Sequence, residues 1–446
     1  MRPWKAAPLF FEKHACYNAS IHPGKDTFPG KGGPVPLHQK SLLKFRLLPL
    51  FFALLFFAVP LSPVPVQAAA KGKIALYFPC WNIYQDEAQQ VKNLPWDKLD
   101  SIQHAFWKIE PDGEGYKIAP SDAYADLDSS NPHAHFPQYA ALAQKYPRVN
   151  ILLSIGGWNH SGHFSQMAAS EKGRASFIES CLQTLESYPF LTGLDIDWEY
   201  PGIPRKGSGK DEGNPATGDD FTNYTLLLKE LRAALDSRFG KGVKKLTVCA
   251  GGTEQILKKQ DYASLHPFVD AIHLMTYDLA LSTQKKTGHH TPLYGALSAD
   301  SAVHFLLSKG VPAGKILLGT PLYSHGWSGV DFSNGPLHAP ASGKNRGGVL
   351  PWKKLKAFEA ETVPENTPGW HIGYDEEAQA AYLWNDDPAS PYHGNFLTYE
   401  SERSLEAKLQ YLLEKGLQGI MIWESGGDDA KNHFPMLQIM HRFLHP

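Results

Sequence analysis

The sequence predicts an α/β fold, namely a (β/α)₈ TIM barrel that carries a small α+β insertion subdomain between strands 7 and 8. From residue 73 onward, eight short apolar runs alternate with longer amphipathic stretches, which is the pattern of repeated βα units. The runs are nearly continuous in apolar residues, as expected for parallel strands covered on both faces. The last two runs lie much farther apart than one crossover helix requires.

The predicted elements follow the chain in a regular order. The eight strands are residues 74–78, 101–106, 150–155, 193–198, 245–250, 271–277, 316–322 and 419–423. Helical periodicity marks residues 174–187, 221–238, 299–309 and 401–415. In such a barrel the chemistry sits at the C-terminal ends of the strands, so residues at these ends are the candidates for a site.

Two insertions interrupt the repeat. Residues 326–396 contain turn signals and a strand-like run at 380–384, which predicts a small α+β subdomain that deepens a cleft on the loop face. Residues 201–220 are rich in Gly, Pro and charge and predict a long loop after the fourth strand. The predicted catalytic domain covers residues 71–446.

The N-terminal part predicts targeting rather than fold. Basic residues 44–46, the apolar run 47–59 and a small-residue cleavage site at 66–69 predict a secretory signal peptide over 42–70. The apolar core is interrupted by prolines and is short for a membrane span, with an uncleaved anchor as the alternative. Residues 1–41 are interpreted as a non-native or disordered extension. We expect a secreted protein, extracellular or periplasmic, without membrane contact after cleavage.

Charge and aromatic content narrow the class of partner. Lys plus Arg number 43 and Asp plus Glu 45, so the sequence gives no electrostatic case for nucleic acid. The 11 Trp, 19 Tyr and 23 Phe supply flat faces on which sugar rings stack, although core packing accounts for most of them. We expect a monomer that binds a neutral ligand.

Cysteine and histidine spacing indicates no metal site. Of the four cysteines, the three beyond the leader are widely spaced and predict neither a disulfide framework nor a zinc pair, although one bridge is left open. The histidines show no metal-ligand spacing either. The sequence therefore predicts neither a metal nor another cofactor.

An acidic strand is the strongest candidate for the site. Alternation places Asp195, Asp197 and Glu199 on one face of residues 193–200, roughly 6.5 Å apart in succession. Burial of like charges raises at least one pKa, and a protonated carboxyl near neutral pH is what an acid catalyst needs. The alternative is a solvated edge strand, but the surrounding residues are apolar. We expect Glu199, the last acid, at the barrel mouth.

Other strand ends converge on the same mouth. They contribute residues 154–158, 275–278, Tyr323 and 423–424. With these pieces in order around an acidic strand, the chain resembles glycoside hydrolase family 18, the chitinases and their relatives, over nearly all of residues 73–443.

The resemblance rests on named motifs. The Ser-x-Gly-Gly motif matches residues 154–157, the end of the acidic motif matches the three acids of the fourth strand, and Met-x-Tyr-Asp matches 275–278. Residues 395–401 and 419–424, and the insertion before the eighth strand, are also similar to the family. Two positions depart from it: Thr192 stands where the acidic motif begins with Asp, and His325 stands where many relatives have Arg.

The resemblance implies a retaining, substrate-assisted reaction, the exception among glycosidases. Glu199 would protonate the glycosidic oxygen while the sugar's own 2-acetamido oxygen attacks the anomeric carbon. Asp197 would hold the acetamide N–H, Asp195 would support Asp197, and Tyr277 would donate to the acetamido group.

The resemblance also implies sugar contacts. Asp278 would contact the distorted sugar, and Trp423 would form the floor of the cleavage subsite. Weaker candidates, for which barrel packing is the alternative, are Met275, Trp158, Tyr77, Phe106 and Tyr323.

The implied function is a secreted chitinase that cleaves β-1,4 bonds between N-acetylglucosamine units, with chitin or another glycan containing that sugar as its partner. One alternative is an N-acetylglucosaminidase that acts on peptidoglycan or on N-glycan cores. Another is a non-hydrolysing chitin-binding lectin. The presence of Glu199 favours an enzyme, because such lectins usually lack the final acid.

Overall fold

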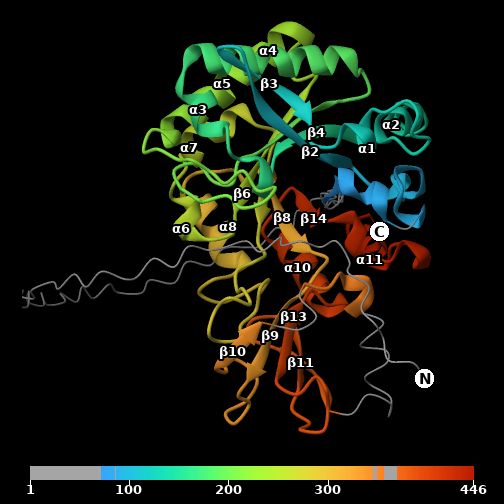
Figure 1. Cartoon of the computed structure of the whole chain (residues 1–446), viewed down its shortest axis with the longest axis vertical. Helices are drawn as coiled ribbons and strands as arrows, with labels where there is room; N and C mark the ends of the chain where they lie inside the picture. The colour runs from blue at the N-terminus through green and yellow to red at the C-terminus, as the bar shows by residue number, and fades with distance from the viewer. Residues whose placement is uncertain (1–71, 86, 345–348, 356–368, 446) are drawn as a thin grey trace, which may run out of the picture. The chain divides into compact units, whose positions relative to one another are not determined.

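A closed parallel barrel forms the centre of the chain. The computed structural model describes residues 72–85, 87–344, 349–355 and 369–445, and within these ranges eight parallel strands close a ring in which β1 pairs with both β2 and β14 (Figure 1). This confirms the predicted TIM barrel. The ring strands are β1 (Lys73–Pro79), β2 (Ser101–Asp112), β4 (Asn150–Gly156), β5 (Gly193–Asp197), β6 (Lys245–Gly251), β7 (Ala271–Met275), β8 (Ile316–Pro321) and β14 (Gly419–Trp423).

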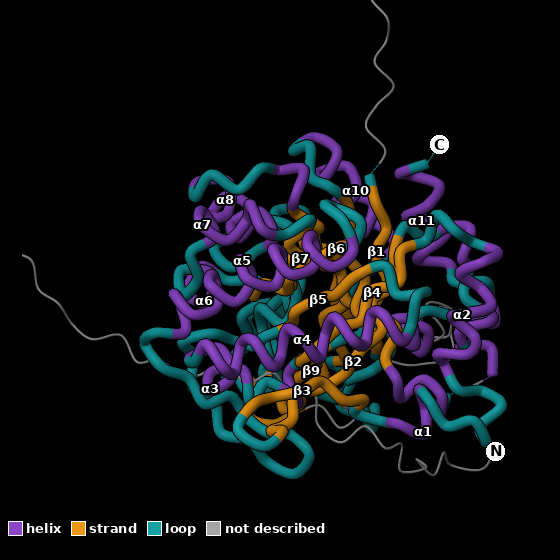
Figure 2. Tube along the Cα trace, turned by 90° about the horizontal axis from the view of Figure 1, so that it is seen from above, coloured by secondary structure: helices purple, strands orange, loops and turns teal. Residues whose placement is uncertain are grey.

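Helices lie outside the strands (Figure 2). The four predicted helices are α4 (Glu171–Ser187), α5 (Asp220–Phe239), α8 (Ala299–Ser308) and α10 (Glu402–Glu414). Side-chain caps fix where α4, α8 and α10 begin, because Ser170, Ser298 and Ser401 each accept a backbone N–H of the first turn. The other helices are α1 (Ala123–Asp126), α2 (His135–Lys145), α3 (Phe164–Ala169), α6 (Glu254–Leu257), α7 (Tyr262–Leu265) and α11 (Pro435–Leu444).

The predicted leader lies outside the described residues. This applies to the extension at 1–41 and to the signal peptide at 42–70. Within the described ranges, none of the helices combines the length and apolar character needed to cross a bilayer.

Strand alternation separates the core from the barrel interior. On β5, Leu194 and Ile196 belong to the main apolar core together with the helical residues Phe177 and Leu227. The intervening acids therefore point to the opposite side, into the barrel.

The first part of the barrel departs from the simple βα pattern. β2 extends beyond the predicted run and folds back as β3 (Gly115–Pro120), its antiparallel partner. Gly113 takes a left-handed conformation with φ 58° in the turn, which suits a residue without Cβ. The connection from β1 to β2 contains 3₁₀ turns in place of a helix: η1 (Cys80–Tyr84), η2 (Glu87–Gln89), η3 (Val91–Asn93) and η4 (Trp96–Lys98).

The insertion between β8 and β14 contains a five-stranded antiparallel sheet in the order β10-β9-β13-β12-β11 (Figure 1). Its strands are β9 (His325–Val330), β10 (Ala341–Lys344), β11 (Trp370–Asp375), β12 (Ala380–Asn385) and β13 (Asn395–Tyr399). The predicted strand-like run is β12. Because β9 begins shortly after β8 ends, the sheet starts at the carboxyl-end face of the barrel.

A buried ion pair ties the insertion to the barrel wall. Glu400 follows β13 and pairs with Lys408 of α10, and both side chains are fully buried. Lys408 also donates to Thr291 Oγ1 at 2.6 Å, while Glu400 accepts from Thr320 Oγ1 of β8 at 2.7 Å and from Ser404 Oγ at 2.5 Å. Burial lowers the pKa of Lys408, and the Glu400 carboxylate opposes that shift.

We expect Lys408→Met to lower the free energy of unfolding by about 3–5 kcal/mol, because it leaves the Glu400 charge buried without a partner. Urea denaturation followed by tryptophan fluorescence measures this change. The double variant Lys408→Met/Glu400→Gln is the control and should regain most of the loss. Equal stability of the single and double variants would contradict the argument.

Candidate active site

Asp195 is the innermost of the three acids and is sealed from solvent. Its carboxylate accepts hydrogen bonds from Tyr77 Oη at 2.8 Å, Ser154 Oγ at 2.7 Å and Thr247 Oγ1 at 2.5 Å. These donors come from β1, β4 and β6, so hydrogen bonds to Asp195 connect three other strands inside the barrel. Asp195 has no exposed surface for a ligand.

Tyr77 belongs to this inner layer. Its hydroxyl also lies 2.8 Å from His273 Nδ1 and 2.9 Å from Cys249 Sγ, and only 1% of the residue is exposed. Tyr77 was predicted, as a weaker candidate, to contact a sugar. In the structure it lies under the site as a support of Asp195, with its hydroxyl in these contacts and its ring covered, and the sugar contact stays a prediction.

Asp197 lies one layer closer to the mouth. Its Oδ1 is buried and has no hydrogen-bond partner among the described residues. Burial raises the pKa of Asp197 well above its usual range, and the nearby Glu199 and Asp195 carboxyls raise it further. A buried acceptor without a donor costs free energy, so this oxygen is suited to receive a donor from a ligand.

Glu199 follows β5 directly and is 7% exposed. Its backbone N–H donates to Ser161 Oγ at 2.9 Å, which fixes the chain at the mouth. Burial raises the pKa of Glu199 to about 7, against the lowering effects of a hydrogen bond with Tyr200 and the Arg205 charge. Glu199 therefore retains a proton in a large fraction of molecules near neutral pH.

The loop after β5 supplies a cation to the site. The Arg205 guanidinium lies over the Trp158 ring, 3.8 Å from its centroid, and donates to the Trp158 carbonyl oxygen and to Asp211. One face of Trp158 is thus covered. Arg205 was not predicted as a site residue, and its only sign in the sequence is the charge-rich composition of residues 201–220.

Asn214 holds the same loop in place. Its Oδ1 accepts from Trp198 Nε1 at 2.9 Å, and its Nδ2 donates to the Tyr200 carbonyl oxygen at 2.7 Å. The two bonds fix the residues on either side of Glu199 in the chain.

A group of aromatic side chains surrounds the mouth. The ring of Trp423 is partly exposed. It stacks with Phe106 at a centroid distance of 5.7 Å and meets Trp81 edge to face at 6.3 Å. Trp423 and Tyr323 keep exposed surface, whereas Phe106 and Met275 are mostly covered.

Two members of this group were not predicted. Trp81 and Tyr200 pack on the same cluster and are partly exposed. Both closely follow the ends of barrel strands, β1 and β5, and this position is the sequence signal that marks them.

The Tyr277 hydroxyl has only a weak hydrogen-bond acceptor nearby. Its Oη lies 3.9 Å from Met421 Sδ, a weak acceptor. Burial raises the pKa of Tyr277 well above its usual range, so the hydroxyl stays protonated and can donate.

Asp278 differs from Glu199 in its protonation. Its Oδ1 accepts from Tyr323 Oη at 2.6 Å and from His325 Nε2 at 2.7 Å. Burial alone would raise the pKa of Asp278, but its interactions with His290 and His325 hold that pKa well below the usual range. Near neutral pH Asp278 therefore stays ionised, whereas Glu199 keeps a proton in a large fraction of molecules.

The unusual Thr192 lies away from this chemistry. Its hydroxyl accepts from the Ile151 N–H at 3.0 Å and lies 3.2 Å from the Ile151 carbonyl oxygen. Thr192 therefore joins β4 to the start of β5, at the opposite end of that strand from Glu199.

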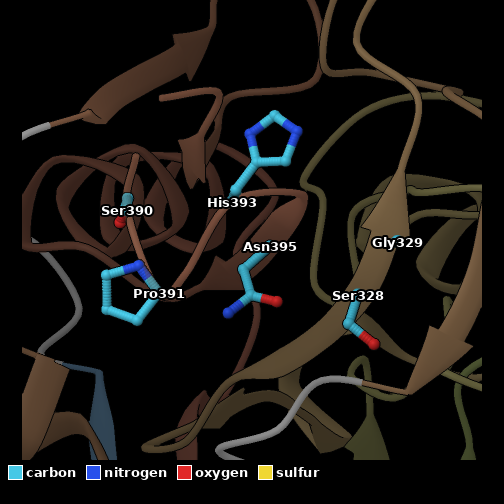
Figure 3. A pocket seen from close by; sticks show the side chains of 6 residues that line it. All are labelled: Ser328, Gly329, Ser390, Pro391, His393 and Asn395. Atoms are coloured by element: carbon cyan, nitrogen blue, oxygen red, sulfur yellow. The ribbon is translucent and has the colours of Figure 1, made fainter. Parts of the chain in front are cut away.

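A separate surface pocket lies on the insertion sheet and contains none of the predicted site residues (Figure 3). It is lined by Ser328, Gly329, Ser390, Pro391, His393 and Asn395. With its small polar lining and no acid, it is not the candidate active site.

The family assignment follows from this arrangement and from the sequence match. Residues 73–428 match Glycosyl hydrolases family 18. The chain belongs to this family. The match spans all eight barrel strands up to β14 and includes every site residue described above.

Family 18 relatives are similar at moderate identity. Chitinase A of Pseudoalteromonas piscicida is 31% identical over 367 residues, which are 72% of this chain and 44% of that protein. This chain thus spans less than half of that relative. Chitinase ChiA74 from Bacillus thuringiensis superimposes with a TM-score of 0.73 at 26% identity, over 84% of this chain and 70% of the other. A family 18 N-acetylglucosaminidase from Paenibacillus barengoltzii gives 0.67 at 30% identity, over 83% and 99%.

If Glu199 is the general acid, kcat/KM for glycoside hydrolysis should fall as pH rises through about 7, because an acid must carry the proton that it donates and the pKa of Glu199 is about 7. A pH–rate profile on a soluble oligosaccharide measures this alkaline limb. Asp197→Asn removes the neighbouring carboxyl and should shift the limb. A limb above pH 9, or one that Asp197→Asn does not move, would show that Glu199 is not the coupled acid.

Proposed function

We propose that this family 18 protein hydrolyses β-1,4 bonds between N-acetylglucosamine units of chitin by a retaining, substrate-assisted reaction. One observation carries the proposal: the buried, unpartnered Oδ1 of Asp197 lies beside an acid, Glu199, whose pKa is raised to about 7. The first can accept an acetamide N–H, and the second can protonate a leaving group.

The proton comes from Glu199. It passes to the glycosidic oxygen as that oxygen leaves the anomeric carbon, and the acetamido oxygen of the same sugar forms a new bond to that carbon. Water then opens the resulting oxazolinium ion, with the Glu199 carboxylate taking the water's proton. Two displacements at one carbon retain its configuration.

Asp197 and Tyr277 would position the acetamido group. The free Oδ1 of Asp197 accepts its N–H, and the Tyr277 hydroxyl, with only a weak acceptor nearby, donates to its oxygen. A preorganised donor of this kind contributes about 10²–10³-fold to rate.

A protein nucleophile is less consistent with the carboxylates present. Asp195 has no exposed surface. Asp278 is ionised, but its Oδ1 is already engaged by Tyr323 and His325. We assign Asp278 to holding the sugar, with Trp423 as the floor beneath it.

Chitin is favoured over the other glycans by the insertion sheet, which begins at the mouth and extends its wall, as an extended polymer requires. A second candidate is an N-acetylglucosaminidase activity on shorter or branched glycans. The similarity to the Paenibacillus barengoltzii enzyme, which this chain covers almost completely, supports that candidate. A lectin without hydrolytic activity is disfavoured because Glu199 is present in an acid-competent environment.

We expect Glu199→Gln to reduce the rate of chitin oligosaccharide hydrolysis by at least about 10³-fold, since it removes the proton donor while keeping the side-chain shape. Calorimetry should show nearly unchanged oligosaccharide binding by the same variant. The matched substrate control is a fully deacetylated oligomer, which lacks the internal nucleophile and should not be cleaved by the wild type. Cleavage of both oligomers at similar rates would exclude the substrate-assisted route.

We propose that the protein is exported and that the signal peptide at residues 42–70 is removed. We expect intact mass analysis of the secreted protein to give an N-terminus near residue 70. A secreted chain that retains residues 1–39 would contradict both the signal peptide and the interpretation of the extension.

A further inference from the structure

Three side chains from separate segments meet beside the proposed sugar site. Asp278 follows β7, His290 lies in the connection to α8, and His325 is the first residue of β9. His325 Nε2 lies 2.7 Å and His290 Nδ1 3.9 Å from Asp278 Oδ1, and one ligand atom from each residue lies within 4.8 Å of the others. The two imidazole centroids are 5.1 Å apart.

The imidazoles have more hydrogen-bonding capacity than their surroundings use. Both ring nitrogens of His290, and Nδ1 of His325, are buried and have no hydrogen-bond partner within the described ranges. His290 has no exposed surface, and the 3.9 Å separation from Asp278 is too long for a hydrogen bond. Buried polar nitrogens without partners are rare in folded proteins, so these nitrogens are suited to bind a ligand.

The three side chains are of the types that bind divalent transition metals. Each imidazole offers a ring nitrogen, and the Asp278 carboxyl offers an oxygen.

We propose that Asp278, His290 and His325 form a binding site for a divalent transition metal ion, with Zn²⁺ as the best match. Two imidazole nitrogens and one carboxylate oxygen are a common zinc ligand set, and a fourth position can remain open to solvent or substrate. The Asp278 side chain is 15% exposed, which provides that opening. Donors around tetrahedral zinc lie about 3.3 Å apart, between the observed 2.7 and 3.9 Å.

Occupancy would oppose glycan binding. The ion would take an Asp278 oxygen and draw His325 Nε2 away from that carboxylate, so Asp278 would no longer be available to a sugar. This consequence rests on the proposed function, whereas metal binding itself does not.

The described part of the chain contains two other groups of potential metal ligands. Neither combines unpartnered imidazole nitrogens with an opening to solvent. Asp195, Cys249 and His273 are all bonded to Tyr77 Oη and fill the barrel interior.

The second group is sealed under α2. His104 and His135 share Asp126, which also accepts from Trp107 Nε1 at 3.0 Å, and the acid and both imidazoles have no exposed surface. Only the cluster around Asp278 combines unpartnered nitrogens on more than one imidazole with an opening to solvent.

The test is isothermal titration of the full chain, after chelation and dialysis, with ZnCl₂ as the probe. We expect one site per chain in the wild type and at least a ~10-fold loss of affinity in His290→Gln and in His325→Arg. His325→Arg introduces the residue that many relatives have at this position and keeps a polar group there. It therefore provides a second test if His290→Gln does not fold. His304→Gln, an exposed histidine on α8, is the matched control and should bind zinc as the wild type does.

Inhibition gives a second readout. Zinc should raise the apparent KM for a chitin oligosaccharide in the wild type and have less effect in His290→Gln and His325→Arg, each compared with its own metal-free rate. No zinc binding by the wild type, or unchanged affinity in both variants, would overturn the proposal, as would a loss confined to Cys249→Ser. If zinc binding follows the expected variants while no oligosaccharide is cleaved, the metal site stands and the proposed function fails.

Discussion

The Asp195 carboxylate inside the barrel is the constraint on which the site depends. Three hydroxyl donors from β1, β4 and β6 stabilise this charge and in doing so join one side of the ring to the other. The charge, enclosed in a medium that screens it weakly, contributes to the raised pKa values of Asp197 and Tyr77. A neutral residue at this position would leave three hydroxyls without this acceptor and would remove one of the charges that raise the pKa of Asp197.

Two carboxyls at the mouth are held in opposite protonation states by different neighbours. Glu199 is surrounded by buried surface and keeps its proton, whereas Asp278 meets two imidazoles and a tyrosine hydroxyl and loses it. Carboxyls in one site commonly differ in protonation because their environments differ. Here the difference arises from which strand end each residue occupies, and so from the order of elements around the ring.

The sequence predicted the parts of this site that depend on local periodicity. Alternation on β5 placed the acids on the inner face, and the ends of barrel strands located Tyr277, Asp278 and Trp423. It did not predict the hairpin of β2 and β3, because the short run after residue 106 is compatible with either a longer strand or a helix. It missed the support of Asp195 by Tyr77 and the stacking of Arg205 on Trp158, since these contacts join distant segments. The meeting of His290 and His325 beside Asp278 was not predicted for the same reason: ligand spacing along a chain identifies sets on one helix or loop, and this set is assembled from three segments.

The position of His325 changes how the inserted sheet should be regarded. Its first residue is bonded to an acid at the end of a barrel strand, and its last strand leads directly into the buried pair of Glu400 and Lys408. The inserted sheet is therefore structurally coupled to the barrel at both its first and its last strand. Grafting the sheet of a relative onto this barrel would exchange one neighbour of Asp278 along with the wall, so the shape of the groove and the charge at its base are inherited together.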